Sequence, residues 1–395
     1  MTIDLSNIIK VSQTKCPCCG SETDIVMDMP NYPVTELFRP ASDESDPYGF
    51  IDQKGRFCSN CGHFFLQNIL DPDVIYSDSN YITSTVSSKG ATDCLDEFYE
   101  FILNNSPNKE FDKKNIVDIG GNDSYLLKKF NGNANRLINI DPHASSDNEN
   151  IEIVKSFFEK IEFSEYNKET GCLFASSHTF EHLEDPVGVL ELIAQHMTDN
   201  DSLFLQFPSI EKLVEFSRYD QICHQHINLF SVNSVTKVLE NLGLNLNAYE
   251  YDTFHFGTIR LMFSKEKTKL KLNHSLSADD IVCSYGNYKT YYGALNNLIE
   301  SKFINGQGFG AGLMVPTLNY HLPVIGKLNK IIDENPFRIG KKFINLPPPV
   351  CGTDQFDMDE PILITSISTK AAARVIFNKL SDLGFKDIFL PTIGS

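Results

Sequence analysis

Two cysteine pairs near the start of the chain constrain its fold more than any other feature. Each pair is C-x-x-C followed by glycine: "CPCCG" contains Cys16 and Cys19, and "CSNCG" contains Cys58 and Cys61. Two thiolates at this spacing can coordinate one metal ion, and the glycine lets the backbone turn with positive φ. Two such units complete a tetrahedral zinc site whose four sulfur ligands make it closed and structural. A chance match or a redox pair is the alternative, which the repeated unit disfavours.

The segment around these cysteines, residues 1–75, is expected to be a small zinc-binding domain. The strand-like stretch "RFCSNCGHFFLQ" fits a zinc-ribbon module. A segment this short has little core of its own, so the metal supplies the missing stability. Cys18 has poorer spacing than Cys16 and is expected to remain a free thiol.

Net charge limits the partners of this chain. Lys and Arg number 34 against 52 Asp and Glu, which gives a formal charge of −18. General binding to nucleic acid or to anionic lipid requires a basic surface, so neither is expected. No apolar run reaches the length of a membrane span, and "MTIDLSNIIK" lacks the pattern of a signal peptide. We therefore expect a cytoplasmic protein whose ten cysteines are thiols and metal ligands rather than disulfides.

The central part of the chain has the pattern of a parallel α/β sheet. "NIVDIGGNDSYLLKKF" predicts a buried strand at 116–119, a glycine turn and a helix. About twenty residues later "RLINIDPHA" predicts a second strand ending at Asp141, a carboxylate placed to bind two ribose hydroxyls. A third strand is expected at 173–176 and a fourth in "DSLFLQFPS". Pro186, after Asp185, suits the first position of the intervening helix.

The glycine turn favours one cofactor class over another. "GGNDS" does not match G-x-G-x-x-G, so the pyrophosphate cradle of a dinucleotide oxidoreductase is incomplete. The turn instead reads D-x-G-x-N-D, formed by Asp118, Gly120, Gly121, Asn122 and Asp123. It leaves room for a small amino-acid tail that the last two side chains can contact. This pattern points to S-adenosylmethionine.

Several motifs together resemble a known family. "VDIGGNDSYLL", "HTFEHLEDP" and "QFPS" look like motifs of class I methyltransferases. With the cysteine pairs, "YDQICHQHINLFS", "NGQGFGAG" and "IIDENPFRIGKKF", the chain resembles the sugar C-methyltransferase family over nearly its whole length. The resemblance implies a zinc-binding domain, a class I methyltransferase domain with a Rossmann-like sheet at 76–270, and a C-terminal Rossmann-like α/β substrate domain at 271–395. It also implies a nucleotide-linked keto-deoxysugar as substrate.

The same resemblance implies roles for residues at the strand ends. Gly120, Gly121 and Asn122 would line the methionine part of the cofactor, and Asp141 would hold its ribose. His178, at the end of the third strand, would lie under the edge of the cofactor. A hydrogen-bonded structural histidine is the alternative for His178, and a helix cap is the alternative for Asp141.

"YDQICHQHINLFS" is expected to lie over the methyl group of the cofactor. The family's loop reads approximately Tyr-His-Glu-His, and its last histidine corresponds to His226, the implied general base. Glu181 and His182 of "EHLEDP" would face the same pocket, and Tyr81 would remain from a tyrosine-rich lid. Methylation of a carbon beside a ketone needs a base, because a C–H proton must leave, and histidine suits that task.

Two departures from the family pattern leave the reaction open. Cys223 stands where the family has tyrosine, which removes a donor that could stabilise an enolate oxygen. Gln225 stands where it has glutamate, which removes a charge that would raise the imidazole pKa. O-methylation of a sugar or related metabolite, and a non-catalytic scaffold in a sugar-modifying complex, are the alternatives. His224 remains a catalytic candidate, a metal ligand together with His226, or a structural loop histidine.

The C-terminal third is expected to begin with a helix at 275–301 and to continue as a second α/β unit. Its glycine turn, "NGQGFGAG", could take the pyrophosphate of a nucleotide-sugar. A domain that serves packing alone is the alternative. The sequence leaves the oligomeric state open.

Overall fold

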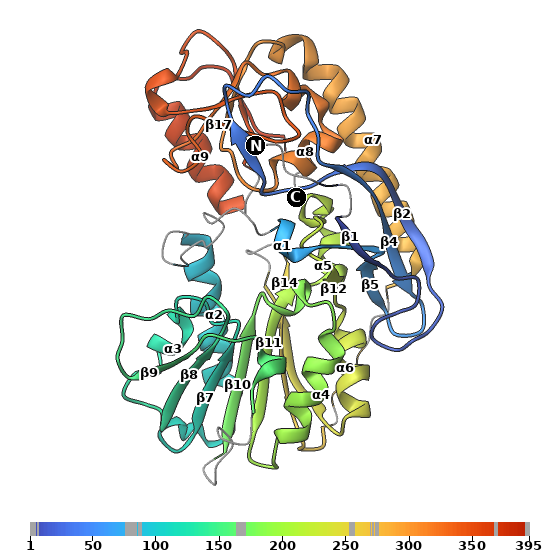
Figure 1. Cartoon of the computed structure of the whole chain (residues 1–395), viewed down its shortest axis with the longest axis vertical. Helices are drawn as coiled ribbons and strands as arrows, with labels where there is room; N and C mark the ends of the chain where they lie inside the picture. The colour runs from blue at the N-terminus through green and yellow to red at the C-terminus, as the bar shows by residue number, and fades with distance from the viewer. Residues whose placement is uncertain are drawn as a thin grey trace.

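The structure, a computed structural model, describes residues 5, 8–75, 85, 89–162, 171–252, 257–268, 270, 272, 276–366 and 370–391. Figure 1 shows a lower part built on one large sheet and an upper part formed by the C-terminal third. The N-terminal segment, in blue, runs along one side of the molecule and reaches both parts.

A seven-stranded sheet forms the lower part, with the order β13-β14-β11-β10-β7-β8-β9. Five neighbouring strands, β11, β10, β7, β8 and β9, run parallel to one another. Strand β14 is antiparallel to both β11 and β13. Strands β7 and β11 are buried along their whole length, as expected where helices cover both faces of a sheet. The strands are β7 (Asn115–Ile119), β8 (Arg136–Ile140), β9 (Ile151–Val154), β10 (Cys172–Ser177), β11 (Ser202–Pro208), β13 (Asn245–Tyr251) and β14 (Thr258–Ser264).

Helices pack on both faces of this sheet (Figure 1). Apolar side chains of α4 (Pro186–His196) and α6 (Val232–Asn241) share one core with the sheet. Those of α2 (Lys89–Asn105) and α3 (Tyr125–Lys128) form a second core on the other face. The predicted start of α4 is confirmed, because the Asp185 carboxylate accepts a hydrogen bond from Gly188 N at 2.9 Å. The helix predicted after the glycine turn is confirmed as α3.

The N-terminal module is a four-stranded antiparallel sheet with the order β12-β5-β4-β2. Its fourth strand, β12 (Asn228–Leu229), comes from the histidine loop and pairs with β5 (His63–Leu66). The other two strands are β2 (Asp24–Pro33) and β4 (Phe50–Cys58). Beside them lie the pair β1 (Ile9–Ser12) and β6 (Asn68–Leu70), and the short helix α1 (Pro72–Ile75).

The upper part contains the predicted second α/β unit, a five-stranded parallel sheet with the order β18-β16-β15-β19-β20. Strand β17 (Lys341–Phe343) pairs with β3 (Phe38–Pro40) and so ties this part to the N-terminal segment. The remaining elements are β15 (Gln307–Phe309), β16 (Lys330–Ile332), β18 (Val350–Cys351), β19 (Ile362–Ile364), β20 (Ile388–Phe389), α5 (Ile210–Glu215), α7 (Ala278–Phe303), α8 (Val315–His321) and α9 (Lys370–Asp382). Among the described residues, no helix combines the length and the apolar character that crossing a membrane requires.

Candidate active site and metal centre

The four predicted cysteine ligands converge on one point. One sulfur atom from each of Cys16, Cys19, Cys58 and Cys61 lies within 4.8 Å of the others. The Sγ–Sγ distance is 3.5 Å for Cys16–Cys61 and for Cys19–Cys58. Four sulfurs placed tetrahedrally at 2.3 Å from Zn²⁺ would be about 3.8 Å apart, so the cluster fits that ion. Cys18, half-buried nearby, is not one of the four.

The two glycines that follow the cysteine pairs adopt the predicted backbone conformation. Gly20 has φ of +70° and Gly62 has φ of +79°. Each donates its N–H to the carbonyl of the first cysteine of its pair, Gly20 to Cys16 at 2.8 Å and Gly62 to Cys58 at 2.7 Å. These turns bring the two thiols of each pair to the same side, as a zinc knuckle requires.

The glycine turn after β7 leaves no room for side chains. A Cβ atom on Gly120, whose φ is +77°, would lie 2.0 Å from Oγ1 of Thr179. A Cβ atom on Gly121 would lie 2.6 Å from Oδ1 of Asn139. The backbone therefore packs closely against the carboxyl ends of β8 and β10, at the edge where α/β sheets bind ligands.

Polar side chains from neighbouring strands surround this turn. Asp141, directly after β8, accepts hydrogen bonds from the backbone N–H groups of Asn122 at 3.3 Å and His143 at 2.6 Å. Asp123 accepts one from Thr85 N at 2.8 Å. Asp118 is buried within β7, and burial, with smaller contributions from Asp141 and Asp123, raises its pKa to about 7. The cofactor residues predicted from sequence thus share one edge of the sheet.

His178 joins this edge from the end of β10. Its backbone has φ of +52°, a conformation that a non-glycine residue adopts only where its surroundings fix it. Its Nδ1 lies 3.0 Å from Ser177 Oγ, which accepts a hydrogen bond from Gln206 Nε2 at 2.8 Å. Gln206 Oε1 in turn accepts one from Arg260 Nε at 2.8 Å. A buried chain of side chains therefore orients His178.

Glu181, His182 and His226 form the second cluster. Each offers one ligand-type atom, and the three atoms lie within 4.8 Å of one another. The two imidazole rings meet edge to face, with centroids 5.1 Å apart. Nδ1 of His182 donates to Gln225 O at 2.9 Å, and Nδ1 of His226 donates to Gln221 O at 2.9 Å. Since a carbonyl can only accept, both rings carry the proton on Nδ1 and a lone pair on Nε2.

Burial sets the protonation of this cluster. It lowers the pKa of His182 to about 3, with a smaller contribution from the nearby His226, so His182 is neutral at physiological pH. It raises the pKa of Glu181 to about 7, a rise that the nearby His226 ring would oppose when protonated. Among the described residues, neither carboxylate oxygen of Glu181 has a hydrogen-bond partner. A buried, unsatisfied carboxyl group beside two imidazoles is costly to maintain without a function.

Asn228 connects the segment that carries Glu181 and His182 with the loop that carries His226. Its Nδ2 donates to the carbonyl of Leu183 at 2.7 Å, directly after the short helix η7 (Phe180–His182). Its Oδ1 lies 3.2 Å from Nε2 of His63, two residues after the last cysteine ligand. The zinc-binding module is thereby linked to both segments that carry the cluster.

His224 lies apart from the cluster, although it is only two residues from His226. Its ring is fully buried, with Nδ1 3.2 Å from Gln53 Nε2 and Nε2 3.4 Å from Tyr32 O. Burial lowers its pKa to about 4. Both ring nitrogens contact the N-terminal module, so the structure supports neither a catalytic role nor a paired metal site for His224.

Gln225 and Cys223 also face the N-terminal module. Gln225 Oε1 accepts a hydrogen bond from Thr35 Oγ1 at 2.7 Å, and its Nε2 donates to Thr35 O at 3.3 Å. Cys223 is buried, which raises its pKa to about 12. The carboxylate next to His226 therefore comes from Glu181 rather than from the loop itself. Tyr81, the predicted lid residue, lies outside the described residues.

Several residues of the site were not foreseen from the sequence, namely Ser177, Gln206, Asn228, Arg260 and Thr35. Ser177 and Gln206 lie at the carboxyl ends of neighbouring parallel strands, β10 and β11, which is a signal that could have identified them. Asn228 and Thr35 act only through contacts with distant segments, and no local pattern marks them.

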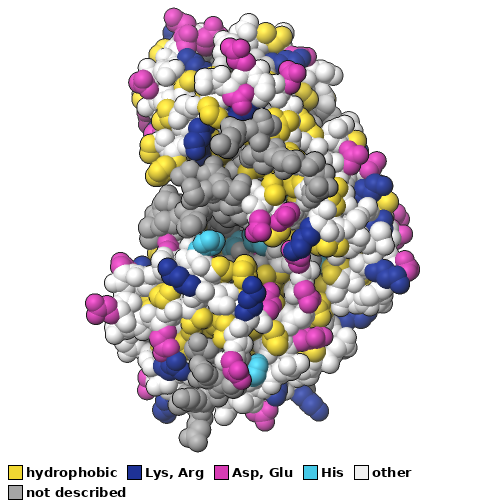
Figure 2. Space-filling view, viewed as in Figure 1, with side chains coloured by type: hydrophobic (Ala, Val, Ile, Leu, Met, Phe, Trp, Pro, Cys, Tyr) yellow, Lys and Arg dark blue, Asp and Glu magenta, His cyan; other side chains and the backbone are white. Residues whose placement is uncertain are grey.

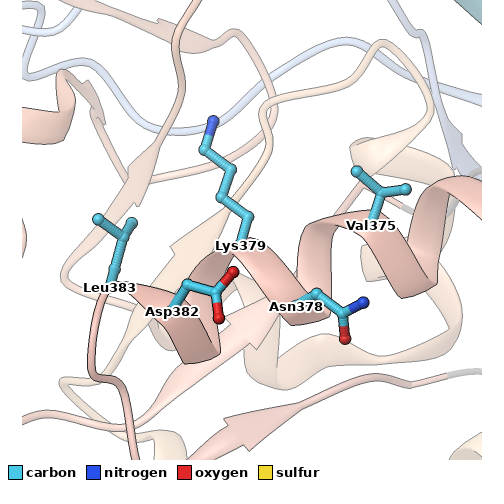
Figure 3. Close-up of a pocket in the computed structure, with 5 residues that line it drawn as sticks. All are labelled: Val375, Asn378, Lys379, Asp382 and Leu383. Atoms are coloured by element: carbon cyan, nitrogen blue, oxygen red, sulfur yellow. The ribbon is translucent and has the colours of Figure 1, made fainter.

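The surface shows histidine side chains in one place and hollows in others. Figure 2 shows histidine side chains reaching the surface between the lower and upper parts. A hollow on the C-terminal part lies elsewhere: Val375, Asn378, Lys379, Asp382 and Leu383 line it along α9 (Figure 3). It contains none of the predicted site residues. A second hollow lies between residues 59–62 and α6.

Comparison with known proteins identifies two parts of the chain. Residues 93–249 match a family model described as a methyltransferase domain, and residues 16–76 match one described as a putative zinc binding domain. A C-methyltransferase, NovU of Streptomyces niveus, is 21% identical over 208 residues, which cover 51% of this chain and 49% of that protein. The chain thus spans about half the length of this curated relative.

Solved structures resemble part of the chain at low identity. A putative methyltransferase in complex with the Trm112 methyltransferase activator of Haloferax volcanii is 15% identical, with a TM-score of 0.36 over 45% of this chain and 93% of that one. Magnesium protoporphyrin IX methyltransferase of Synechocystis PCC 6803, with bound SAH, is 10% identical, with a TM-score of 0.35 over 45% and 84%.

The strand order and the domain matches confirm the expected fold. The large sheet is that of a class I S-adenosylmethionine methyltransferase, preceded by a zinc-binding domain. S-adenosylmethionine is the cofactor of this fold, and the close-packed glycine turn and acidic strand ends fit it. Zinc is the metal of the four-cysteine centre.

Proposed function

We propose that this protein transfers a methyl group from S-adenosylmethionine to a carbon atom of a nucleotide-linked deoxy or keto sugar. The observation that carries the proposal is the Glu181–His182–His226 cluster, which adjoins the carboxyl end of β10 in a methyltransferase domain. The sugar class follows from the family resemblance and from the name of the C-methyltransferase relative.

Residues at the sheet edge hold the cofactor in this proposal. Gly120 and Gly121 admit its methionine part, with Asn122 and Asp123 beside it, and Asp141 binds the ribose hydroxyls. Asp118 supports the turn from within β7, and His178 lies under the cofactor edge. S-adenosylmethionine, when bound, supplies an electrophilic methyl group carried on a sulfonium.

His226 is the proposed general base. Its Nδ1–H is fixed by Gln221 O, so Nε2 has the lone pair that removes the substrate proton. His182 is a poor base because its pKa is about 3. The proton and the positive charge then stay on His226, where the Glu181 carboxylate stabilises the imidazolium. Glu181 thus supplies, in this proposal, the supporting carboxylate that the family has at the position of Gln225.

O-methylation of a sugar hydroxyl is the second candidate, favoured by one observation. Cys223 is buried and replaces the tyrosine that would stabilise an enolate oxygen. Removal of a hydroxyl proton by His226 needs no such donor, so the same cluster serves that reaction.

The experiment is a product analysis with S-adenosylmethionine that carries a ¹³C-labelled methyl group. The purified protein is incubated with nucleotide-linked sugars that have or lack a keto group, and the products are examined by NMR. A labelled methyl group bonded to a sugar carbon supports the proposal. A labelled methyl group bonded to a sugar oxygen supports the second candidate. A protein that binds the cofactor but methylates no sugar in the panel would contradict the proposed substrate class.

A further inference from the structure

We propose that Glu181, His182 and His226 form a second metal site, which binds one divalent transition-metal ion of the Zn²⁺ or Co²⁺ type. The site is distinct from the four-cysteine centre, because the two clusters share no residue. The proposal concerns ion binding and does not depend on the identity of the methyl acceptor.

The donor set is the first argument. Two neutral imidazoles and one carboxylate are the ligands of open zinc sites, in which water or substrate occupies a further position. Nδ1 of His182 and Nδ1 of His226 each donate to a backbone carbonyl, which directs the lone pair of each ring to Nε2. Such second hydrogen bonds to the backbone are the usual means of fixing a metal-binding histidine.

The geometry is the second argument. The three donor atoms lie within 4.8 Å of one another, and ligands at about 2.1 Å from a tetrahedral ion are about 3.4 Å apart. Small rotations of the side chains would bring all three atoms to that separation. The backbone is already held, since Asn228 bonds to Leu183 O and His182 bonds to Gln225 O across the two segments.

The buried carboxyl group is the third argument. Glu181 is 1% exposed, and neither of its oxygens has a hydrogen-bond partner among the described residues. Burial of a polar group without a partner is costly, whereas a cation bound by two imidazoles would satisfy it.

An ion at this site would directly affect the proposed general base, His226. Nε2 of His226 cannot bind a cation and accept a proton at the same time. If the proposed function holds, a bound ion therefore blocks the base, and free Zn²⁺ inhibits methyl transfer reversibly. The protein would then lose activity when the concentration of free zinc rises.

The test is a titration of the zinc-containing full-length protein with Co²⁺, followed by visible absorption. We expect one further Co²⁺ per chain, with d–d bands of nitrogen and oxygen ligands and without the charge-transfer bands of thiolate ligands. His182→Gln and Glu181→Gln should each weaken this binding at least tenfold. The matched control is His196→Gln, on α4 outside the cluster, which should bind Co²⁺ as the wild type does.

Either of two results would overturn the site: no further equivalent of Co²⁺ in the wild type, or a further equivalent that both variants retain with full affinity. If one variant fails to fold, the other variant still tests whether the further Co²⁺ binds at this cluster. Inhibition by Zn²⁺, and its reversal by a weak chelator, is measured separately. Failure to find any methyl acceptor would remove the proposed function and leave the cobalt result standing.

Discussion

At the scale of single residues, burial distinguishes histidines that the sequence presents as equivalent. His224 and His226 are two positions apart, yet one is enclosed by the N-terminal module and the other faces Glu181. His182 and His226 lie in one cluster, and burial lowers the pKa of His182 to about 3. The choice of a catalytic histidine therefore depends on contacts from segments that lie far away in the sequence.

The role of His226 gives the first prediction. His226→Gln should lower kcat at least 100-fold, because general-base catalysis typically contributes that much, while the cofactor Kd changes less than threefold. Single-turnover kinetics and calorimetric titration with S-adenosylmethionine measure the two quantities. His196→Gln, away from the cluster, serves as the control. A variant that keeps more than a third of the wild-type kcat would remove His226 from the mechanism.

His224 gives a second prediction, about stability. Its pKa is lowered to about 4 in the folded protein, whereas an unfolded histidine titrates near 6.5. Below pH 6.5 the unfolded chain therefore binds a proton at His224 that the folded chain does not bind. The free energy of unfolding falls as the pH falls. Between pH 7 and pH 5 this histidine should contribute a loss of about 2 kcal/mol.

The measurement is denaturant unfolding of wild type and His224→Gln at both pH values. The variant should show a pH-dependent loss that is smaller by about that amount. His143→Gln, at an exposed position, is measured beside it as the control substitution. An equal loss in wild type and His224→Gln would mean that His224 takes up its proton in the folded state.

At the scale of elements, the strand–turn–helix unit around Gly120 combines a left-handed backbone with close packing. Gly120→Ala places a methyl group 2.0 Å from Thr179 Oγ1 at a φ of +77°. We expect a loss of more than about 3 kcal/mol in unfolding free energy and at least tenfold weaker cofactor binding, because both strain and overlap must be relieved.

Gly243 is the matched control for this turn. Its φ is +83°, but a Cβ atom added there would meet none of the described residues within 4 Å beyond its chain neighbours, so Gly243→Ala carries the backbone cost alone. That cost is about 1 to 2 kcal/mol. Equal effects of the two substitutions on unfolding would show that the packing against Thr179 is unimportant.

The elements that could be predicted from sequence are those with local signals. The cysteine knuckles, the strands β7, β8, β10 and β11, the start of α4 and the second α/β unit all have such signals and are confirmed. The pairing of β12 with β5 has none, because it joins residues more than 160 positions apart. Without that pairing, the sequence could not show that the loop holding His226 belongs to the sheet of the zinc-binding module.

The presence or absence of a local sequence signal also explains which site residues could be predicted. Asp141 and His178 follow strands, so the strand count places them at the sheet edge. Glu181 and His182 came from the family motif, and the structure brings them to His226. Gln225 contacts Thr35, and Glu181 is the carboxyl group beside His226. A comparison of the loop motif position by position could not show this placement.

At the scale of the whole molecule, the zinc centre is connected to the candidate active site. Cys61 precedes β5, whose first residue, His63, lies 3.2 Å from Asn228 through their side chains. Asn228 also bonds to Leu183 O beside the Glu181–His182 segment. Loss of the metal should therefore loosen the histidine loop as well as the N-terminal module.

Cys61→Ser tests this connection, and Cys18→Ser is its control. Cys61→Ser should lose zinc by metal analysis, increase hydrogen exchange in β5 and in residues 219–229, and reduce methyl transfer at least tenfold. Cys18→Ser should keep one zinc per chain and wild-type exchange, because Cys18 is outside the four-sulfur cluster. Exchange that rises in β5 while residues 219–229 stay protected would mean that the loop is held by the methyltransferase sheet alone, and that the zinc centre stabilises only its own module.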